Sequence, residues 1–345
     1  MKLIESKAEY IPQEEGLKGI YKQIELAGRT AYKSEDKMID IISIDIASLP
    51  ENINIEDIPN YKENQQQCIE YLCNHNIKYQ IVNSAKDFVD RMIKSKHGAA
   101  LEHGTVYLFY SVSCYDRGGQ KWVSKYESNP YSKVICVGVD DDEPAEDDNY
   151  YNLMGNEACG NEQHVITTNY RTLIENNWLD DLQYLCSPTE FHENRYTMRF
   201  TCDRGVSHQL VRERLMSFLQ ESQRYCSYIK EKFGASVTFI QPDWIETSDQ
   251  KEFEEDIKAI EQLYFKWLNK GYKAEEARYF LINGTKTEIV VTAFASDWRH
   301  MLDLRYFEKT GKVSPDMKDL MQKTQKVMQE AGIWEDIMSK PSKFE

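Results

Sequence analysis

The sequence predicts an α+β fold, because strand-like and helix-like segments follow one another without a regular βαβ alternation. Residues 105–112 and 287–293 are rich in β-branched and aromatic side chains, which is typical of strands. Residues 85–95, 253–268 and 315–331 place apolar side chains at helical spacing. A chain of 345 residues with 41% hydrophobic residues is long enough to bury a sizeable core.

The same periodicities predict the remaining elements. We expect further strands at residues 2–6, 196–201 and 237–240. We expect further helices at residues 14–27, 167–175, 178–186, 274–281 and 297–305, and one whose interior runs from His208 to Met216. Two segments that contain proline or paired glycines are expected to be loops or turns, at residues 48–67 and 116–132.

Composition excludes several classes of protein. The net charge of -15 argues against binding duplex DNA or an anionic membrane over the whole surface. No segment approaches the ~18 consecutive apolar residues of a membrane span, and the N-terminus turns polar at once. The eight cysteines form no CxxC pair, so we expect no metal site and a reduced, cytoplasmic protein. The acidic run at residues 140–148 is interpreted as a solvated loop rather than a metal site.

Arginines are concentrated in one stretch of this acidic chain, namely Arg195, Arg199, Arg204, Arg212, Arg214 and Arg224. Guanidinium groups can grip phosphates with two hydrogen bonds, so one interpretation is a site for phosphorylated ligands. The other is a set of ion pairs with the surplus acids. Arginines two positions apart on a helix point about 200° apart, so Arg212 and Arg214 cannot contact the same atoms unless the helix end is irregular or two ligands meet there. GxGxxG and GxxxxGK[ST] loops are absent, so side chains would hold any nucleotide.

These arginines lie in a recognisable motif. Residues 202–214 read Cys-Asp-Arg-Gly-Val-Ser-His-Gln-Leu-Val-Arg-Glu-Arg, and Ser-Gln-Arg-Tyr follows at residues 222–225. This stretch resembles the signature of flavin-dependent thymidylate synthases, which is Arg-His-Arg, about seven residues, and then Ser, usually extended to Ser-x-Arg-Tyr. Three further segments resemble the same family, at residues 28–34, 97–103 and 297–305.

The resemblance implies a single α+β domain over residues 1–345, with a central antiparallel-rich sheet, flanking helices, and insertions at about residues 48–67 and 114–164. It implies a homotetramer with active sites at subunit interfaces. It also implies an enzyme that binds FAD, dUMP, methylenetetrahydrofolate and NADPH and reductively methylates dUMP to dTMP. The cofactors carry the hard chemistry, and the protein orients them.

The resemblance also assigns roles to residues. Expected near the flavin are His97, Arg212, Glu213, Arg214, Gln220 and His300. Expected to bind dUMP are Gln209, Arg212, Gln220, Ser222, Arg224, Arg278 and Arg305. Arg305 and Ser222 are the expected catalytic residues, because a fixed cation beside the uracil favours negative charge on the ring and makes its C5 a better nucleophile.

Each role has a structural alternative. Ser222 can simply hydrogen-bond to backbone, and as a nucleophile it needs an activating base that the sequence does not identify. His97 and His300 can be ordinary core histidines. Arg278 and Arg305 can be ion-pair partners of Glu276 and Asp303. Glu102 and His103 can merely cap the strand that follows them.

Departures from the family pattern keep two other functions open. Glu213 stands where the family has histidine, Phe294 and Ser296 stand where it has asparagine and arginine, and a later histidine aligns near Ser314. The uracil-binding half is therefore better kept than the flavin-binding half. One alternative is a degenerate homologue that binds dUMP or another nucleotide without turnover. A remoter one is a binder of single-stranded nucleic acid, which the net charge opposes.

Overall fold

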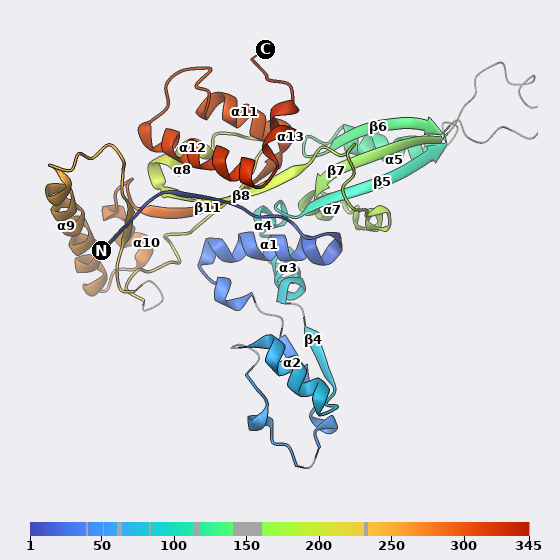
Figure 1. The fold of residues 1–345 in the computed structure, drawn as a ribbon, viewed down its shortest axis with the longest axis horizontal. Helices are drawn as coiled ribbons and strands as arrows, with labels where there is room; N and C mark the ends of the chain where they lie inside the picture. The colour runs from blue at the N-terminus through green and yellow to red at the C-terminus, as the bar shows by residue number, and fades with distance from the viewer. Residues whose placement is uncertain are drawn as a thin grey trace, which may run out of the picture.

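A computed structural model describes residues 1–38, 41–50, 52–60, 64–82, 84–113, 117–140, 161–230 and 234–344. The expected acidic loop at residues 140–148 therefore lies almost wholly outside the described residues. The α+β class is confirmed, with antiparallel sheets and helices in the same chain (Figure 1).

One antiparallel sheet organises the part of the chain that carries the arginine motif. Its strands are β2 (Lys7–Tyr10), β8 (Arg195–Asp203), β11 (Lys286–Phe294) and β9 (Ser217–Gln220), in that spatial order. β8 and β11 pair along their whole length, from Lys286 opposite Asp203 to Phe294 opposite Arg195. The expected strands at residues 196–201 and 287–293 are therefore confirmed.

Helices cover both faces of this sheet (Figure 1). On one face lie α8 (Arg204–Leu210), α11 (Ala295–Arg305), α12 (Pro315–Glu330) and α13 (Trp334–Ser339), around a core that contains the fully buried Trp298. On the other lies α1 (Gly16–Tyr32), with α3 (Ser84–Lys94) and α4 (Gly98–Leu101) packed against it. Gly28 allows α1 and α3 to approach, since a Cβ there would lie 2.3 Å from the Phe88 ring.

A second antiparallel sheet has the order β5-β7-β6, from β5 (Thr105–Ser113), β7 (Asn161–Asn169) and β6 (Lys133–Asp140). The helix expected from residue 167 is wrong in its first turn, because residues 167–169 complete the β7 ladder. The helix α7 (Tyr170–Asn176) starts only after Asn169, whose side chain caps it, and the 3₁₀ helix η4 (Leu179–Tyr184) follows.

The turn expected at residues 116–132 is also wrong, since α5 (Arg117–Glu127) fills much of it. The buried Tyr126 ring lies 4.9 Å from that of Trp178 and 5.3 Å from that of Trp122. Burial of such large aromatic side chains outweighs the cost of the glycines in the first turn of the helix.

Two smaller units complete the fold. β1 (Lys2–Ile4) pairs in parallel with β10 (Thr238–Ile240), beside α9 (Gln250–Asn269), α10 (Ala274–Ala277) and the 3₁₀ helix η6 (Arg278–Phe280). The short 3₁₀ helix η1 (Glu35–Lys37) follows α1.

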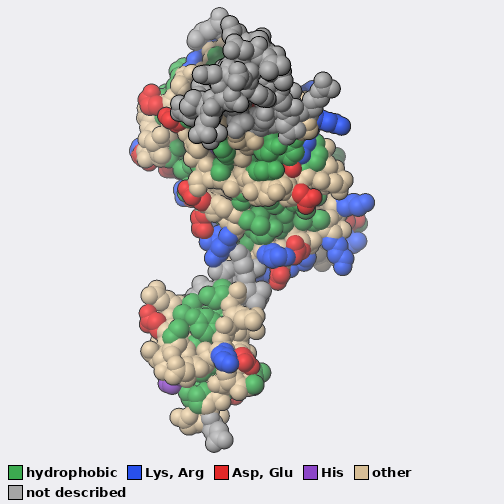
Figure 2. All heavy atoms as spheres, turned by 90° about the vertical axis from the view of Figure 1, so that its right-hand side faces the viewer, with side chains coloured by type: hydrophobic (Ala, Val, Ile, Leu, Met, Phe, Trp, Pro, Cys, Tyr) green, Lys and Arg blue, Asp and Glu red, His purple; other side chains and the backbone are tan. Residues whose placement is uncertain are grey.

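The other unit is a lobe within residues 41–82 that stands apart from the rest of the molecule (Figure 2). It consists of β3 (Ile41–Ile44), η2 (Ile46–Ser48), η3 (Ile55–Asp57), α2 (Gln65–Asn74) and β4 (Tyr79–Val82). Its own small core contains Ile42, Cys68, Leu72 and Ile77. The loop expected at residues 48–67 falls inside this lobe, which extends beyond it on both sides.

Candidate functional site

The Arg-x-Arg segment lies in an irregular turn. Asp203 caps α8, its Oδ1 accepting the Val206 N–H at 2.8 Å, but the helix ends at Leu210. The helix expected to continue to Met216 is wrong, because Ser217 already pairs with β11 at the start of β9. Arg212 and Arg214 are both exposed and line one cavity of about 280 Å³. The end of this helix is thus irregular. An irregular helix end was one of the two conditions under which Arg212 and Arg214 can contact the same ligand.

Glu213 turns away from these arginines and towards α11. Its carboxylate lies 3.4 Å from Nη2 of Arg305 and 3.8 Å from Nε2 of His300. The structure therefore brings together three predicted site residues, and the alternative pairing of Arg305 with Asp303 is not found among the residues that the structure describes. Asp303 instead contacts Arg299 and Lys309. The His300 ring also stacks on Phe344, with centroids 5.6 Å apart.

The other departures from the family pattern have structural roles. Phe294 is buried at the end of β11, and the guanidinium of Arg195 lies 5.4 Å from its ring centroid. The backbone N–H of Ser296 donates to Glu193 at 3.1 Å. Ser314, where a family histidine aligns, accepts a hydrogen bond from Gln209 at 3.0 Å.

A second group of predicted residues follows β9. The Gln220 amide donates to Ser207 at 2.8 Å and to Thr287 at 3.1 Å. The backbone N–H of Ser222 donates to the Ala31 carbonyl at 2.9 Å, and its Oγ accepts the Arg224 N–H at 3.3 Å. The Oγ of Ser222 therefore contacts a backbone N–H, which cannot act as an activating base. This agrees with the alternative in which Ser222 simply hydrogen-bonds to backbone. These contacts form a short turn, residues 222–224, that presents an exposed Arg224.

Arg224 and Arg278 meet at α10. Nε of Arg224 lies 3.4 Å from the Glu275 carboxylate, and Nε of Arg278 donates to the Glu275 backbone carbonyl at 3.2 Å. The alternative pairing of Arg278 with Glu276 is not found in the described parts of the chain, where Glu276 accepts the Lys273 N–H at the start of α10. Two exposed guanidiniums from distant segments therefore share one surface, which suits a phosphate.

Two predicted residues lie outside both groups. His97 is exposed at the start of α4. Gln209 lines a separate, mostly apolar cavity of about 310 Å³ that also contains Trp244 and Phe253. Among the described residues, no hydrogen bond or ion pair joins either side chain to the turn of Arg212 or to that of Arg224.

The sequence placed Arg204 in the arginine concentration without a role of its own, and it did not single out Glu221 or Lys286. Arg204 starts α8, and its Nη1 is buried without a hydrogen-bond partner in the described structure. Burial, reinforced by the nearby charge of Arg278, lowers the pKa of Arg204. Glu221 lies inside the motif between Gln220 and Ser222, and this position could have marked it as a candidate site residue. Lys286, which pairs with Glu221, lies outside the motif and has no sequence feature that marks it.

Other arginines and histidines of the recognised segments are structural. Arg195 is buried and donates to Glu102, Thr105 and Ser217, and Arg199 pairs with Glu9 at 3.0 Å. His103 is fully buried, with Nδ1 2.8 Å from the Thr292 hydroxyl. Burial and the neighbouring Arg195 lower the pKa of His103 to about 3. Ion pairing thus accounts for part of the arginine concentration.

No helix in the described parts of the chain is long and apolar enough to cross a membrane. Within the same residues, no group of three or more His, Cys, Asp or Glu side chains is placed to hold a metal ion.

The family described as "Thymidylate synthase complementing protein" matches residues 151–331, just over half of the chain. The chain belongs to this family. The matched residues contain both arginine turns, Arg278 and α11, so both groups described above lie in the part of the chain that the thymidylate synthase complementing family shares.

Named relatives cover less of the chain. Flavin-dependent thymidylate synthases from Pyrococcus furiosus and Thermococcus kodakarensis are 34% and 38% identical over 111 and 110 residues. In each case the match covers 31% of this chain, and this chain spans only 44% of the relative's length.

Solved structures show weaker likeness. A Helicobacter pylori flavin-dependent thymidylate synthase complexed with FAD and dUMP is 19% identical, covering 41% of this chain and 72% of that chain, with a TM-score of 0.31. The UMP/dUMP methylase PolB from Streptomyces cacaoi, bound with 5-Br dUMP, is 12% identical. The match covers 98% of this chain and 97% of that chain, with a TM-score of 0.37. At these scores the likeness decides nothing about the site.

The environment of His103 predicts a pH dependence of stability. Between its folded pKa of about 3 and the ordinary value near 6.5, only the unfolded chain binds this proton. The free energy of unfolding should therefore fall as pH drops from about 6.5, by up to about 1.4 kcal/mol per pH unit. Urea unfolding of the wild type and His103→Gln at several pH values measures this, and the variant should show the shallower slope. Parallel curves would contradict it.

Proposed function

We propose that this chain is a thymidylate synthase that reductively methylates dUMP to dTMP with methylenetetrahydrofolate, NADPH and FAD. The observation that carries the proposal is the convergence of Arg224 and Arg278 at Glu275, beside Ser222 and Gln220, in a chain that belongs to the family. A phosphate binds well to two exposed guanidiniums, while an amide and a hydroxyl nearby can hydrogen-bond to the rest of a nucleotide.

The reaction replaces the hydrogen on uracil C5 with a methyl group. The methylene carbon comes from the folate, which leaves as tetrahydrofolate, and two electrons from NADPH complete the methyl group. Bound FAD would supply the hydride transfer between NADPH and the one-carbon unit. In this proposal Arg224 and Arg278 hold the phosphate, Gln220 and Ser222 orient the nucleotide, and Arg305 stabilises negative charge on the uracil ring.

The turn at Arg212 fits a phosphate-bearing cofactor. Both guanidiniums are exposed at a cavity, and Nδ1 of His300 and Nε of Arg305 are buried without hydrogen-bond partners among the described residues. Glu213 lines the same cavity, and the Arg305 guanidinium 3.4 Å from its carboxylate offsets the negative charge that would repel a phosphate. We propose that Arg212, Arg214 and His300 would hold the flavin, with His97 and Gln220 as further contacts.

We also propose a cytoplasmic homotetramer in which one subunit supplies Gln209, Arg212 and Arg305 to the nucleotide held by another. Large apolar side chains beside both groups are exposed, namely Val211, Leu215, Tyr225 and Tyr279, the last to 86%. Exposed apolar groups around a polar site are typical of a contact surface. Residues 1–345 would act as one domain, with additions at about residues 48–67 and 114–164.

Removing Arg224 should weaken nucleotide binding. Arg224→Ala removes one of the two charged partners of the phosphate, which costs about 2 kcal/mol, or roughly thirtyfold in the dissociation constant. Titration calorimetry with dUMP measures this. Arg171→Ala, which removes an ion-paired arginine from α7, is the matched control and should bind dUMP as the wild type does. Unchanged affinity in the Arg224 variant would refute the phosphate assignment.

Mixing two impaired variants tests the shared site. At a dUMP concentration well below the dissociation constant of the Arg224 variant, Arg224→Ala and Arg305→Ala should each form little dTMP as pure proteins. If each site takes these residues from two subunits, tetramers assembled from an equal mixture should recover about a quarter of the wild-type activity. No recovery, with mixed tetramers demonstrated by mass spectrometry, would place both residues in one subunit's site.

A second candidate function is nucleotide binding without turnover, which Phe294 and Ser296 favour because their contacts are purely structural. The visible absorption spectrum of the protein with excess FAD and dUMP separates the two. We expect the spectrum of a bound flavin that is released on denaturation. A protein that binds dUMP but retains no flavin would instead be the degenerate homologue.

A further inference from the structure

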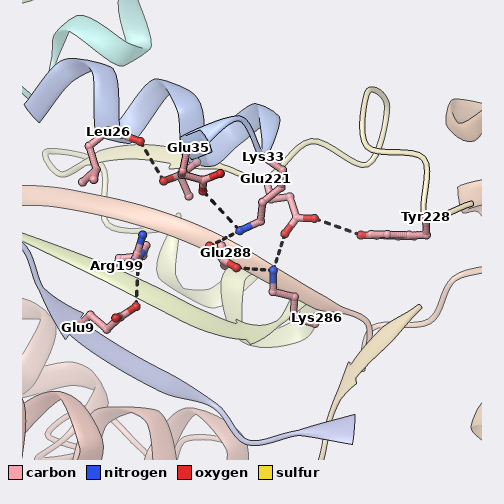
Figure 3. A network of polar contacts seen from close by, with 10 residues as sticks. Glu9, Leu26, Lys33, Glu35, Arg199, Glu221, Tyr228, Lys286 and Glu288 are labelled. Carbon is pink, nitrogen blue, oxygen red and sulfur yellow. Dashed lines mark hydrogen bonds and ion pairs between the residues drawn. The ribbon is translucent and has the colours of Figure 1, made fainter. Parts of the chain in front are cut away.

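A chain of alternating charges ends at Glu221, three residues before Arg224, and Figure 3 shows its members. It runs from Glu35 through Lys33, Glu288 and Lys286 to Glu221. Lys33 lies 3.6 Å from Glu35 and also pairs with Glu288, while Nζ of Lys286 lies 2.5 Å from Glu288 and 3.0 Å from Glu221. The network joins the end of α1, strand β11 and the segment after β9.

Glu221 is the most deeply buried member, with its side chain only 1% exposed. Its second oxygen lies 3.5 Å from the hydroxyl of Tyr228, whose pKa burial and Glu221 together raise well above its ordinary value. Tyr228 is therefore a permanent donor. Burial alone would lower the pKa of Lys286, but the carboxylates of Glu221 and Glu288 outweigh it and raise that pKa. Lys286 is therefore held as a cation beside Glu221, and a buried pair of this kind is costly to break by removing one partner.

The network faces away from the proposed nucleotide. On β11, Thr287 lies between Lys286 and Glu288, so its side chain points to the opposite face of the sheet. Gln220 bonds to Thr287, whereas Glu221 bonds to Lys286. Four members of the network also line a cavity of about 750 Å³, namely Lys33, Glu35, Glu221 and Lys286, and the charges of these four are paired within the network.

Gln223 and Cys226 beside Arg224 are buried, and the Tyr225 ring lies 5.6 Å from that of Tyr32, but the Arg224 side chain itself is exposed. Its ion pair with Glu275 is exposed, at 55% and 40% for the two side chains, and such pairs contribute little. Backbone contacts lie two and three residues before Arg224, where the Ser222 N–H donates to the Ala31 carbonyl and the Glu221 N–H donates to the Glu288 carbonyl at 2.7 Å. The two backbone hydrogen bonds and the Glu221 side chain therefore attach residues 221 and 222 to α1 and β11.

We propose that Glu221 is a positioning residue: fixed by Lys286 and Tyr228, it holds residues 222–224 so that Arg224 meets the phosphate of the nucleotide. This inference rests on the proposed function. Glu221 touches neither substrate nor cofactor and acts only through Arg224. Ser222 keeps its own backbone bond to Ala31 without the Glu221 side chain, so the loss of Glu221 should weaken recognition of the phosphate and leave recognition of the nucleoside unchanged.

A double-mutant cycle tests this. Glu221→Gln should weaken dUMP binding about tenfold by calorimetry and raise the KM for dUMP with kcat nearly unchanged, while deoxyuridine affinity stays constant. Adding Glu221→Gln to the Arg224→Ala variant should not weaken dUMP binding further, because the guanidinium that Glu221 positions is already absent. Lys286→Arg, which keeps the charge, should bind dUMP better than Lys286→Met. Additive losses, or equal losses for dUMP and deoxyuridine, would overturn the inference.

Asp181 offers a matched control for general destabilisation. Its buried carboxylate also accepts from a lysine and a tyrosine, at 2.5 Å from Lys125 and 2.5 Å from Tyr126. Asp181→Asn should lower the thermal midpoint as Glu221→Gln does, without changing dUMP affinity. Equal loss of affinity in both would refute a positioning role. Absence of dUMP binding by the wild type would refute the proposed function and this inference together, whereas normal binding by both wild type and Glu221→Gln would refute the inference alone.

Discussion

The hydrogen bonds that β11 makes with β8 and β9 set the positions of both arginine turns. The ladder with β8 fixes where α8 begins, and the ladder with β9 fixes where the chain must return after it. Only a short irregular segment remains between Leu210 and Ser217, and it carries Arg212, Glu213 and Arg214. The same strand continues directly into α11, which brings His300 and Arg305 to Glu213.

This dependence explains what the sequence could and could not predict. Long periodic elements such as α9 and α12 and strands such as β5 and β11 were predictable, because each local pattern agrees with the final burial. The end of α8 was not, because Leu210, Val211, Leu215 and Met216 continue a helical pattern. Val211 and Leu215 are in fact 42% and 47% exposed, so that pattern does not describe a buried helical face.

The candidate site shows the same division. The motif and the family resemblance supplied the residue types, but only the fold shows that Arg224 and Arg278 converge on Glu275, or that Glu213 selects Arg305 rather than Arg212. Lys286 could not have been found, because a single lysine in a strand carries no local signal of its partners. Its importance comes from a buried carboxylate 65 residues earlier in the chain.

The lobe within residues 41–82 keeps its small apolar core separate from the cores of the two larger sheets (Figure 2). A two-stranded sheet with one short helix is marginal on its own, so this unit has a low free energy of local opening. Neither arginine turn takes a strand partner or a side-chain contact from it in the described structure. The lobe can therefore unfold and refold as a unit while the sheet that carries the candidate site stays intact.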